Sequence, residues 1–151
     1  MANTYSSLFY HFVFSTKSRK YFIKPEMESR LWRYIGGIAN TNGFTAVQVG
    51  GIEDHVHVLA LAPPKIDPSK MVKLIKGGSS RWIHTEFDWL RGFEWQDGYS
   101  AFSVSKSAVP SVDRYIRSQR SHHGRMSFED EYRKLLSLHD IDPVDERYIF
   151  G

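Results

Sequence analysis

The sequence contains no cysteine, so neither a disulfide framework nor a thiolate metal site is possible. It also lacks long hydrophobic runs. A stretch such as HVLALAPP (57–64) is far too short to cross a bilayer, and no signal peptide precedes it. The 151 residues are 41% hydrophobic and 15% aromatic, which is typical of a folded globular chain. We therefore expect a soluble, cytoplasmic protein with one domain over residues 1–151 and no membrane contact.

The net charge is small, +3 at pH 7, but it is unevenly distributed. Residues 106–125 carry five basic side chains and a single acidic one, Asp113. A basic segment on an otherwise balanced domain is typical of a contact with a polyanion. An ordinary solvated helix face would show the same count, so charge alone leaves both interpretations open.

The spacing of apolar residues predicts the order of helices and strands. Strands are expected where aromatic and β-branched residues gather or alternate, and helices where apolar residues recur at helical spacing. Two of the strands, 44–50 and 54–62, are expected to form a hairpin joined around Gly50 and Gly51. The other strands are expected at 4–16 and 99–105, and the helices at 24–43, from 69 onwards, around 108–122 and around 127–138.

This order predicts an α+β fold, a ferredoxin-like antiparallel sheet with helices (β-α-β-β-α-β plus C-terminal helices). Many unrelated functions use this fold. Function must therefore be argued from particular residues.

A pair of histidines stands inside the strand DHVHVLA (54–60). Because strand side chains alternate between faces, His55 and His57 point to one side of the sheet, and Val56 and Val58 to the other. Two adjacent imidazoles on one face are a pair of potential metal ligands. The alternative is two half-exposed histidines on a sheet surface.

The segment SVDRYIRSQRSHH (111–123) offers a completion of such a site. On a helix, Tyr115 and Gln119 share one stripe with Val112 and Ile116, so the stripe that faces the protein contains an amide. A buried amide needs partners, and its carbonyl oxygen suits Mg²⁺ or Mn²⁺. The alternative is a structural Tyr–Gln pair.

Two further histidines follow in that segment. His122 and His123 are adjacent on a helix and should point about 100° apart. We expect a surface pair at the helix end, or phosphate contacts, rather than two ligands of one ion.

At this point the sequence resembles a known family. DHVHVLA is similar to the His-hydrophobe-His (HUH) motif of the single-tyrosine transposases, the insertion-sequence-200-like family and its REP-associated tyrosine transposase relatives. YIRSQRSHH (115–123) resembles that family's catalytic helix, with a glutamine four residues after the tyrosine. Ser118 departs from the asparagine common there. The similarity continues in order through residues 10–20, 73–83, 98–105 and 128–136.

The resemblance implies a DNA transposase that cleaves and rejoins single-stranded DNA at hairpin-marked ends. A divalent metal, Mg²⁺ or Mn²⁺, would be held by His55, His57 and Gln119 and would polarise the scissile phosphate. Tyr115 would attack the phosphorus and form a 5′-phosphotyrosine. The family also implies a homodimer in which the tyrosine helix of one copy works in the partner's active site.

Candidate DNA contacts are the basic residues after the first strand and along the second helix: Lys17, Arg19, Lys20, Lys73, Lys76 and Arg81. The glycines of KGGSSR (76–81) would let a backbone approach DNA closely, or would mark a helix kink. Two other functions remain open. A non-catalytic nucleic-acid-binding module explains the charge but not the His–Tyr–Gln set. A metal-dependent hydrolase gives Tyr115 no role.

Overall fold

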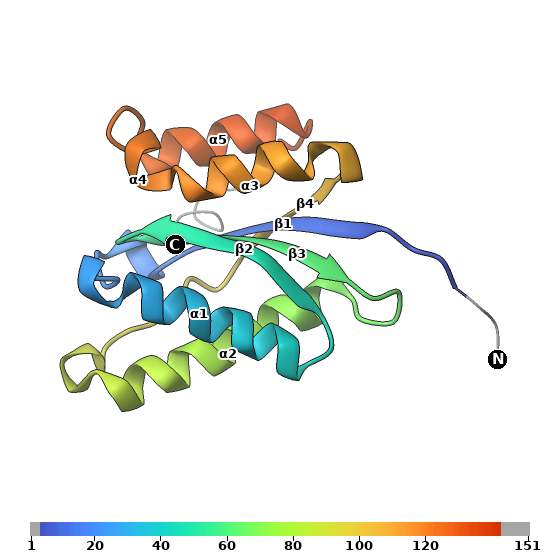
Figure 1. Cartoon of the computed structure of the whole chain (residues 1–151). Helices are drawn as coiled ribbons and strands as arrows, with labels where there is room; N and C mark the ends of the chain where they lie inside the picture. The colour runs from blue at the N-terminus through green and yellow to red at the C-terminus, as the bar shows by residue number, and fades with distance from the viewer. Residues whose placement is uncertain (1–3, 143–151) are drawn as a thin grey trace.

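The computed structural model describes residues 4–142 as one four-stranded antiparallel sheet between two layers of helices (Figure 1). The strand order is β2-β3-β1-β4, which confirms the predicted ferredoxin-like arrangement. The predicted domain, 1–151, extends at both ends beyond the described residues. Among these residues, no helix is long and apolar enough to cross a membrane. The elements are β1 Leu8–Ser15, α1 Pro25–Thr41, β2 Thr45–Ile52, β3 His55–Ala62, α2 Pro68–Glu86, β4 Ser100–Val104, α3 Val109–Arg117, α4 Gln119–His122 and α5 Phe128–Leu138, with short turns of 3-10 helix at Lys17–Arg19, Asp88–Leu90 and Lys106–Ala108.

The two faces of the sheet are built from alternate residues of the same strands. One face packs against α1 and α2 and forms the larger core, which includes Phe12, Phe14 and Val58. The other face lies under α3, α4 and α5 (Figure 1), where Val13 and Phe102 meet the apolar side of α5. Both faces of the sheet are therefore covered.

The hairpin between β2 and β3 does not turn where the glycines predicted. Gly50 and Gly51 lie inside β2 and pair with His57 and Val56. The turn is formed by the two residues between the strands, Glu53 and Asp54. Gly50 serves packing instead, because a Cβ there would lie 2.5 Å from the carbonyl oxygen of Ile116. A side chain at this position would push α3 away from the sheet.

The tyrosine helix is shorter than predicted. The expected helix around 108–122 divides at Ser118, whose φ of −95° and ψ of 16° separate α3 from α4. The hydroxyl of Ser118 bonds the carbonyl of Tyr115 at 3.2 Å, a local bond that competes with helix continuation. The predicted helix around 127–138 is confirmed as α5, which the side chain of Ser127 caps at its N-terminus.

Candidate active site

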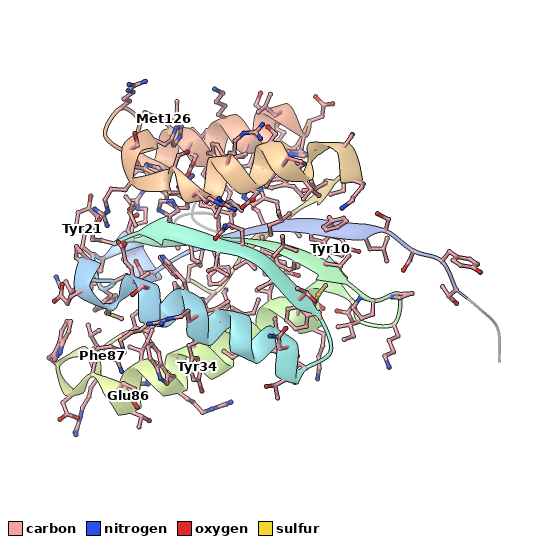
Figure 2. All side chains as sticks on the ribbon, in the orientation of Figure 1. Tyr10, Tyr21, Tyr34, Glu86, Phe87 and Met126 are labelled. Atoms are coloured by element: carbon pink, nitrogen blue, oxygen red, sulfur yellow. The ribbon has the colours of Figure 1, made fainter. Side chains whose placement is uncertain are left out.

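The histidine pair lies on the face of the sheet that α3, α4 and α5 cover. His55 and His57 are both 0% exposed, so the half-exposed alternative is wrong. Side chains fill the space between the sheet and the helical layer above it (Figure 2). The alternation of side chains along a strand correctly predicted that both rings lie on one face of the sheet. Their burial comes from α3, α4 and α5, which follow much later in the chain.

Each of these two histidines has a polar atom within 3.2 Å of each ring nitrogen. His55 has Nδ1 2.8 Å from Asp54 Oδ1 and Nε2 2.9 Å from Gln119 Oε1. His57 has Nδ1 2.7 Å from His11 Nε2 and Nε2 3.2 Å from Glu131 Oε1. Partners on the Nδ1 side hold both rings with Nε2 directed toward α4 and α5.

Tyr115 and Gln119 lie at the same place. Gln119 is 1% exposed, and its amide nitrogen donates to Glu131 Oε2 at 3.0 Å. The hydroxyl of Tyr115 donates to the same carboxylate oxygen, and its ring centroid lies 5.7 Å from that of His57. The helical stripe thus brings all four predicted residues into one cluster.

Glu131 stands at the centre of this cluster, and sequence reasoning did not find it. It comes from α5, is 1% exposed, and accepts hydrogen bonds from Tyr115 and Gln119. The available signal was its position three residues after Phe128, on the face of α5 that also carries Tyr132 and Leu136. A carboxylate on the apolar face of a helix needs buried partners.

The surrounding imidazoles hold Glu131 in its charged form. Burial by itself would raise its pKa, but the attraction and hydrogen bonds of His57 and His123, with the charge of His55, outweigh burial and keep the pKa well below its usual range. The site therefore contains a carboxylate anion surrounded by rings.

Tyr115 is in the opposite situation. Burial, followed by the charge of Glu131 and the hydrogen bond to it, raises the pKa of the Tyr115 phenol above its ordinary value. Without a cation nearby, this phenol stays protonated and is a weak nucleophile.

His11 and His123 are two more members that the sequence did not predict. Burial is the largest cause that lowers the pKa of His11 and of His57. Contrary to the expectation from their spacing, His122 and His123 converge on one carboxylate. Their Nε2 atoms lie 3.3 Å and 3.0 Å from oxygens of Glu131.

The donor set fits a divalent metal ion. Ligand atoms of His55, His57 and Glu131 all lie within 4.8 Å of one another. Asp54 Oδ1 accepts a hydrogen bond from Nδ1–H of His55, and in the neutral ring the Nε2 lone pair then faces the amide oxygen of Gln119. Two acceptors at 2.9 Å repel unless a cation or a proton lies between them.

A cavity of about 450 Å³ gives access to the tyrosine. It lies between β4, α3 and α5, and its walls include Tyr115, Glu131 and His122. Its remaining lining is mostly apolar, with Phe102, Val104 and Leu135. A ligand can therefore reach the cluster from the side of β4.

The candidate DNA contacts fall into two groups. Lys17 and Arg19 lie in the short 3-10 turn after β1 and pair with Glu94 and with Glu129, the latter on α5. Lys20 follows directly, with Nζ 5.9 Å from the ring centroid of Phe22. Arg19 thus links this turn to the helix that carries Glu131.

The second group lies on α2, below the sheet and away from the histidine pair (Figure 1). Lys73 and Arg81 belong to it, as does Lys76, whose amine donates to the carbonyls of Gln96 and Gly98 at 2.7 Å each. The KGGSSR segment is continuous helix rather than a kink. A Cβ at Gly78 would lie 2.8 Å from Ile38 Cδ1, so this glycine lets α1 pack closely.

The fold and the site together define a class. A ferredoxin-like sheet with a buried His-x-His pair, beside a helical tyrosine and glutamine, is the arrangement of the single-tyrosine HUH proteins. Residues 4–119 match the family described as "Transposase IS200 like". The chain therefore belongs to the IS200-like transposase family.

Individual relatives agree with this assignment. The ISDra2 transposase TnpA of Deinococcus radiodurans is 29% identical over 115 residues, which cover 73% of this chain and 82% of that protein. The transposase of insertion sequence element IS200 from Salmonella typhimurium is 27% identical over 144 residues, 91% of this chain and 89% of the relative.

Two solved structures are similar. The crystal structure of a candidate transposase from Deinococcus radiodurans R1 superposes with a TM-score of 0.66 at 28% identity, covering 79% of this chain and 95% of that one. A REP-associated tyrosine transposase bound to a REP hairpin gives a TM-score of 0.61 at 16% identity, covering 83% and 74%. At that identity the second similarity concerns the fold alone.

Proposed function

We propose that this chain is a metal-dependent transposase that cleaves and rejoins single-stranded DNA, with Tyr115 as the nucleophile. The observation that carries the proposal is the meeting of Tyr115 with His55, His57 and Gln119 in one buried cluster. A purely structural Tyr–Gln pair would not need two histidines beside it whose Nδ1 atoms are held by Asp54 and His11.

The reaction conserves the number of phosphodiester-type bonds. The Tyr115 oxygen attacks the scissile phosphorus, the bond from phosphorus to the 3′ oxygen breaks, and a 5′-phosphotyrosine and a free 3′-OH result. In the net reaction the phenolic proton ends on the leaving 3′ oxygen. Because water takes no part, a different 3′-OH can reverse the step and join a new strand.

The residues of this chain bind, orient and hold protons in that reaction. His55, His57 and Gln119 would hold Mg²⁺ or Mn²⁺, with the carboxylate of Glu131 within reach. The bound ion supplies Lewis-acid polarisation of the phosphate. Asp54 and His11 orient the two histidines from behind.

The substrate we propose is a DNA strand marked by hairpins at the element ends. The solved REP-associated tyrosine transposase with the same fold is described as bound to a REP hairpin. Lys17, Arg19 and Lys20 are the proposed phosphate contacts nearest to α5, and Lys73 and Arg81 form a separate set on α2. Lys76 belongs to that set as well, although its amine also bonds two backbone carbonyls.

We also propose a homodimer. The single catalytic tyrosine of each chain can hold only one 5′ end, and two DNA ends must be handled. In the trans arrangement that the family resemblance implies, α3 of one copy serves the histidine pair of the other.

The decisive experiment is a covalent-adduct assay. Hairpin-flanked single-stranded DNA is incubated with protein and Mn²⁺, and a gel-stable protein–DNA adduct is expected. Tyr115→Phe should bind the same DNA without forming the adduct, because only the phenolic oxygen is lost. The matched control is Tyr34→Phe on α1, in the opposite layer (Figure 2), which should form adduct normally. An adduct that persists in Tyr115→Phe would assign the nucleophile to another residue and contradict the proposal. No adduct with the wild type would also contradict it and would favour a binding module.

A further inference from the structure

The cavity of about 450 Å³ beside Tyr115 extends beyond the histidine cluster and has mostly apolar walls. Phe102 and Val104 on β4 form one wall, and Val112 on α3 and Leu135 on α5 form others. The volume lies within the range of about 300–1,000 Å³ that is usual for small-molecule sites. A phosphate or a metal ion gains nothing from such walls, because burying a charge among apolar side chains is costly. The proposed chemistry of Tyr115 therefore does not account for this cavity.

Part of the cavity wall is aromatic. The rings of Phe102 and His139 stack with their centroids 4.4 Å apart and their planes 18° from parallel, and both residues line the cavity. Three side chains with hydroxyl groups line it as well: Ser103, Ser105 and Ser111. A hydroxyl can both donate and accept a hydrogen bond. The cavity thus combines apolar and aromatic surface with a few groups that can bond the polar edge of a flat ring.

A nucleobase is the part of a DNA strand that matches this lining. Its two faces stack on aromatic and apolar side chains, and its edge carries hydrogen-bond donors and acceptors. The sugar and the phosphate have no comparable flat face. Lys134, which is exposed on α5, also lines the cavity and brings a positive charge that suits the phosphate of a bound nucleotide.

The cavity begins where the proposed chemistry takes place. Tyr115 and Glu131 belong both to its lining and to the buried cluster, in which the Tyr115 hydroxyl donates to Glu131. A strand whose scissile phosphate reaches that hydroxyl has a neighbouring base beside the cavity.

We propose that this cavity binds the base of a nucleotide that flanks the scissile phosphate, so that the protein itself recognises the strand at the point of cleavage. The inference rests on the proposed function, because it takes single-stranded DNA as the ligand. It gives Phe102 and the other apolar residues of the cavity a role in substrate selection, separate from the chemistry of the histidine cluster.

The test removes bases from the DNA and space from the cavity. Single-stranded hairpin DNA is prepared with one base removed at a time along the strand, and its affinity for the wild type is measured by fluorescence anisotropy in the presence of Mn²⁺. Adduct formation on the intact strand locates the cleavage point. Removal of one base beside that point should weaken binding by about 10-fold, the scale expected for the loss of one stacked base.

Ala108→Phe fills the cavity from the end of the 3-10 turn that precedes α3, where Ala108 is part of the lining. This variant should bind the intact strand about 10-fold more weakly than the wild type does, because the phenyl ring takes the place of the base. It should bind the strand without the flanking base as the wild type does, since both changes remove the same contact. The matched control is Ala101→Phe, at an exposed position of β4 outside the cavity lining, which should bind both strands normally. Val104→Trp fills the cavity from β4 and replaces Ala108→Phe if that protein does not fold.

Two results would overturn the inference. One is a scan in which no base beside the cleavage point affects binding by the wild type. The other is a base whose effect is unchanged in the cavity-filling variant, as expected of a base that only pairs with another DNA base. In both cases the wild type still forms the adduct, so the proposed function stands. A wild type that forms no adduct contradicts the proposed function, and the affinity scan then decides the inference alone, since it requires one base whose effect disappears when the cavity is filled.

Discussion

His57 is held at both ring nitrogens by residues that come from other elements. His11 on β1 contacts Nδ1, and Glu131 on α5 contacts Nε2. In the contact between His11 Nε2 and His57 Nδ1 one of the two nitrogens donates, and when His57 Nδ1 is the donor in a neutral ring, its Nε2 is free to bind a metal. His11 is thus a positioning residue for its neighbour.

At the residue scale we predict that His57→Ala abolishes DNA cleavage while the protein remains folded, because the larger core lies on the other face of the sheet. Glu131 loses one buried partner, which costs about 1–3 kcal/mol. For a chain of this size, each kcal/mol of lost stability lowers Tm by about 2–4 °C. Adduct formation and thermal melting measure the two effects.

Removal of the metal should reproduce the loss of cleavage that is predicted for His57→Ala. Chelator should stop cleavage by the wild type, and added Mn²⁺ should restore it to the wild type but not to His57→Ala. His84→Ala, on the opposite layer, is the control for loss of a histidine and should cleave normally. Full cleavage in chelator would mean that the histidines have another role.

At the scale of elements, the position of Tyr115 depends on how closely α3 lies against β2. Gly50 makes that approach possible, because a Cβ there would lie 2.5 Å from Ile116 O and 2.9 Å from Ile116 Cγ2. The backbone oxygen cannot move without moving the helix. Ile116 is adjacent to Tyr115, so a shift of the helix moves the tyrosine directly.

We therefore predict that Gly50→Ala lowers both stability and cleavage. Overpacking of this kind costs about 1–3 kcal/mol, and the displaced tyrosine should slow single-turnover cleavage with less effect on DNA binding. Thermal melting and a time course of adduct formation measure the two. Gly36→Ala on α1 is the control, because a Cβ there meets nothing within 4 Å. It should keep full activity and gain about 0.5–1 kcal/mol. A Gly50→Ala protein that melts and cleaves like the wild type would contradict the close packing.

The errors in the predicted elements have local physical causes. The glycine pair suggested a turn because glycine is common in hairpins, but packing against α3 can require glycine in a strand equally well. The helix break at Ser118 escaped prediction because the apolar stripe continues across it, from Tyr115 and Ile116 to Gln119. A local hydroxyl bond and tertiary packing decide that break, and periodicity does not report either.

At the scale of the whole molecule, one chain already brings Tyr115 beside its own His57. The trans arrangement differs from this in which copy supplies the tyrosine helix. If helices are exchanged in the proposed dimer, Tyr115→Phe and His57→Ala are each inactive alone. In a mixed dimer both lesions fall in one composite site, and the other site is intact.

We accordingly predict that mixing the two inactive proteins recovers cleavage at about one site per heterodimer, once subunits have exchanged. The measurement is adduct formation in the mixture, with exchange followed independently by two affinity tags. A mixture that stays inactive after confirmed exchange assigns the site to a single chain.

Local pattern in the sequence was sufficient for part of this site. Strand alternation fixed the common face of His55 and His57, and helical spacing fixed the stripe of Tyr115 and Gln119, because both depend only on backbone periodicity. The spacing of apolar residues also predicted the order of helices and strands, and that order predicted the fold. The structure confirms these placements, and the roles of the residues in catalysis remain predictions.

Only the tertiary structure decided what surrounds those four residues. Glu131 lies 74 positions along the chain from His57, and His11 lies 46 positions from it. Such contacts arise from strand pairing and from the packing of α5 over the sheet, which no short-range spacing encodes. His123 shows the same limit at close range, because its direction depends on where the chain leaves α4 and bonds Met126.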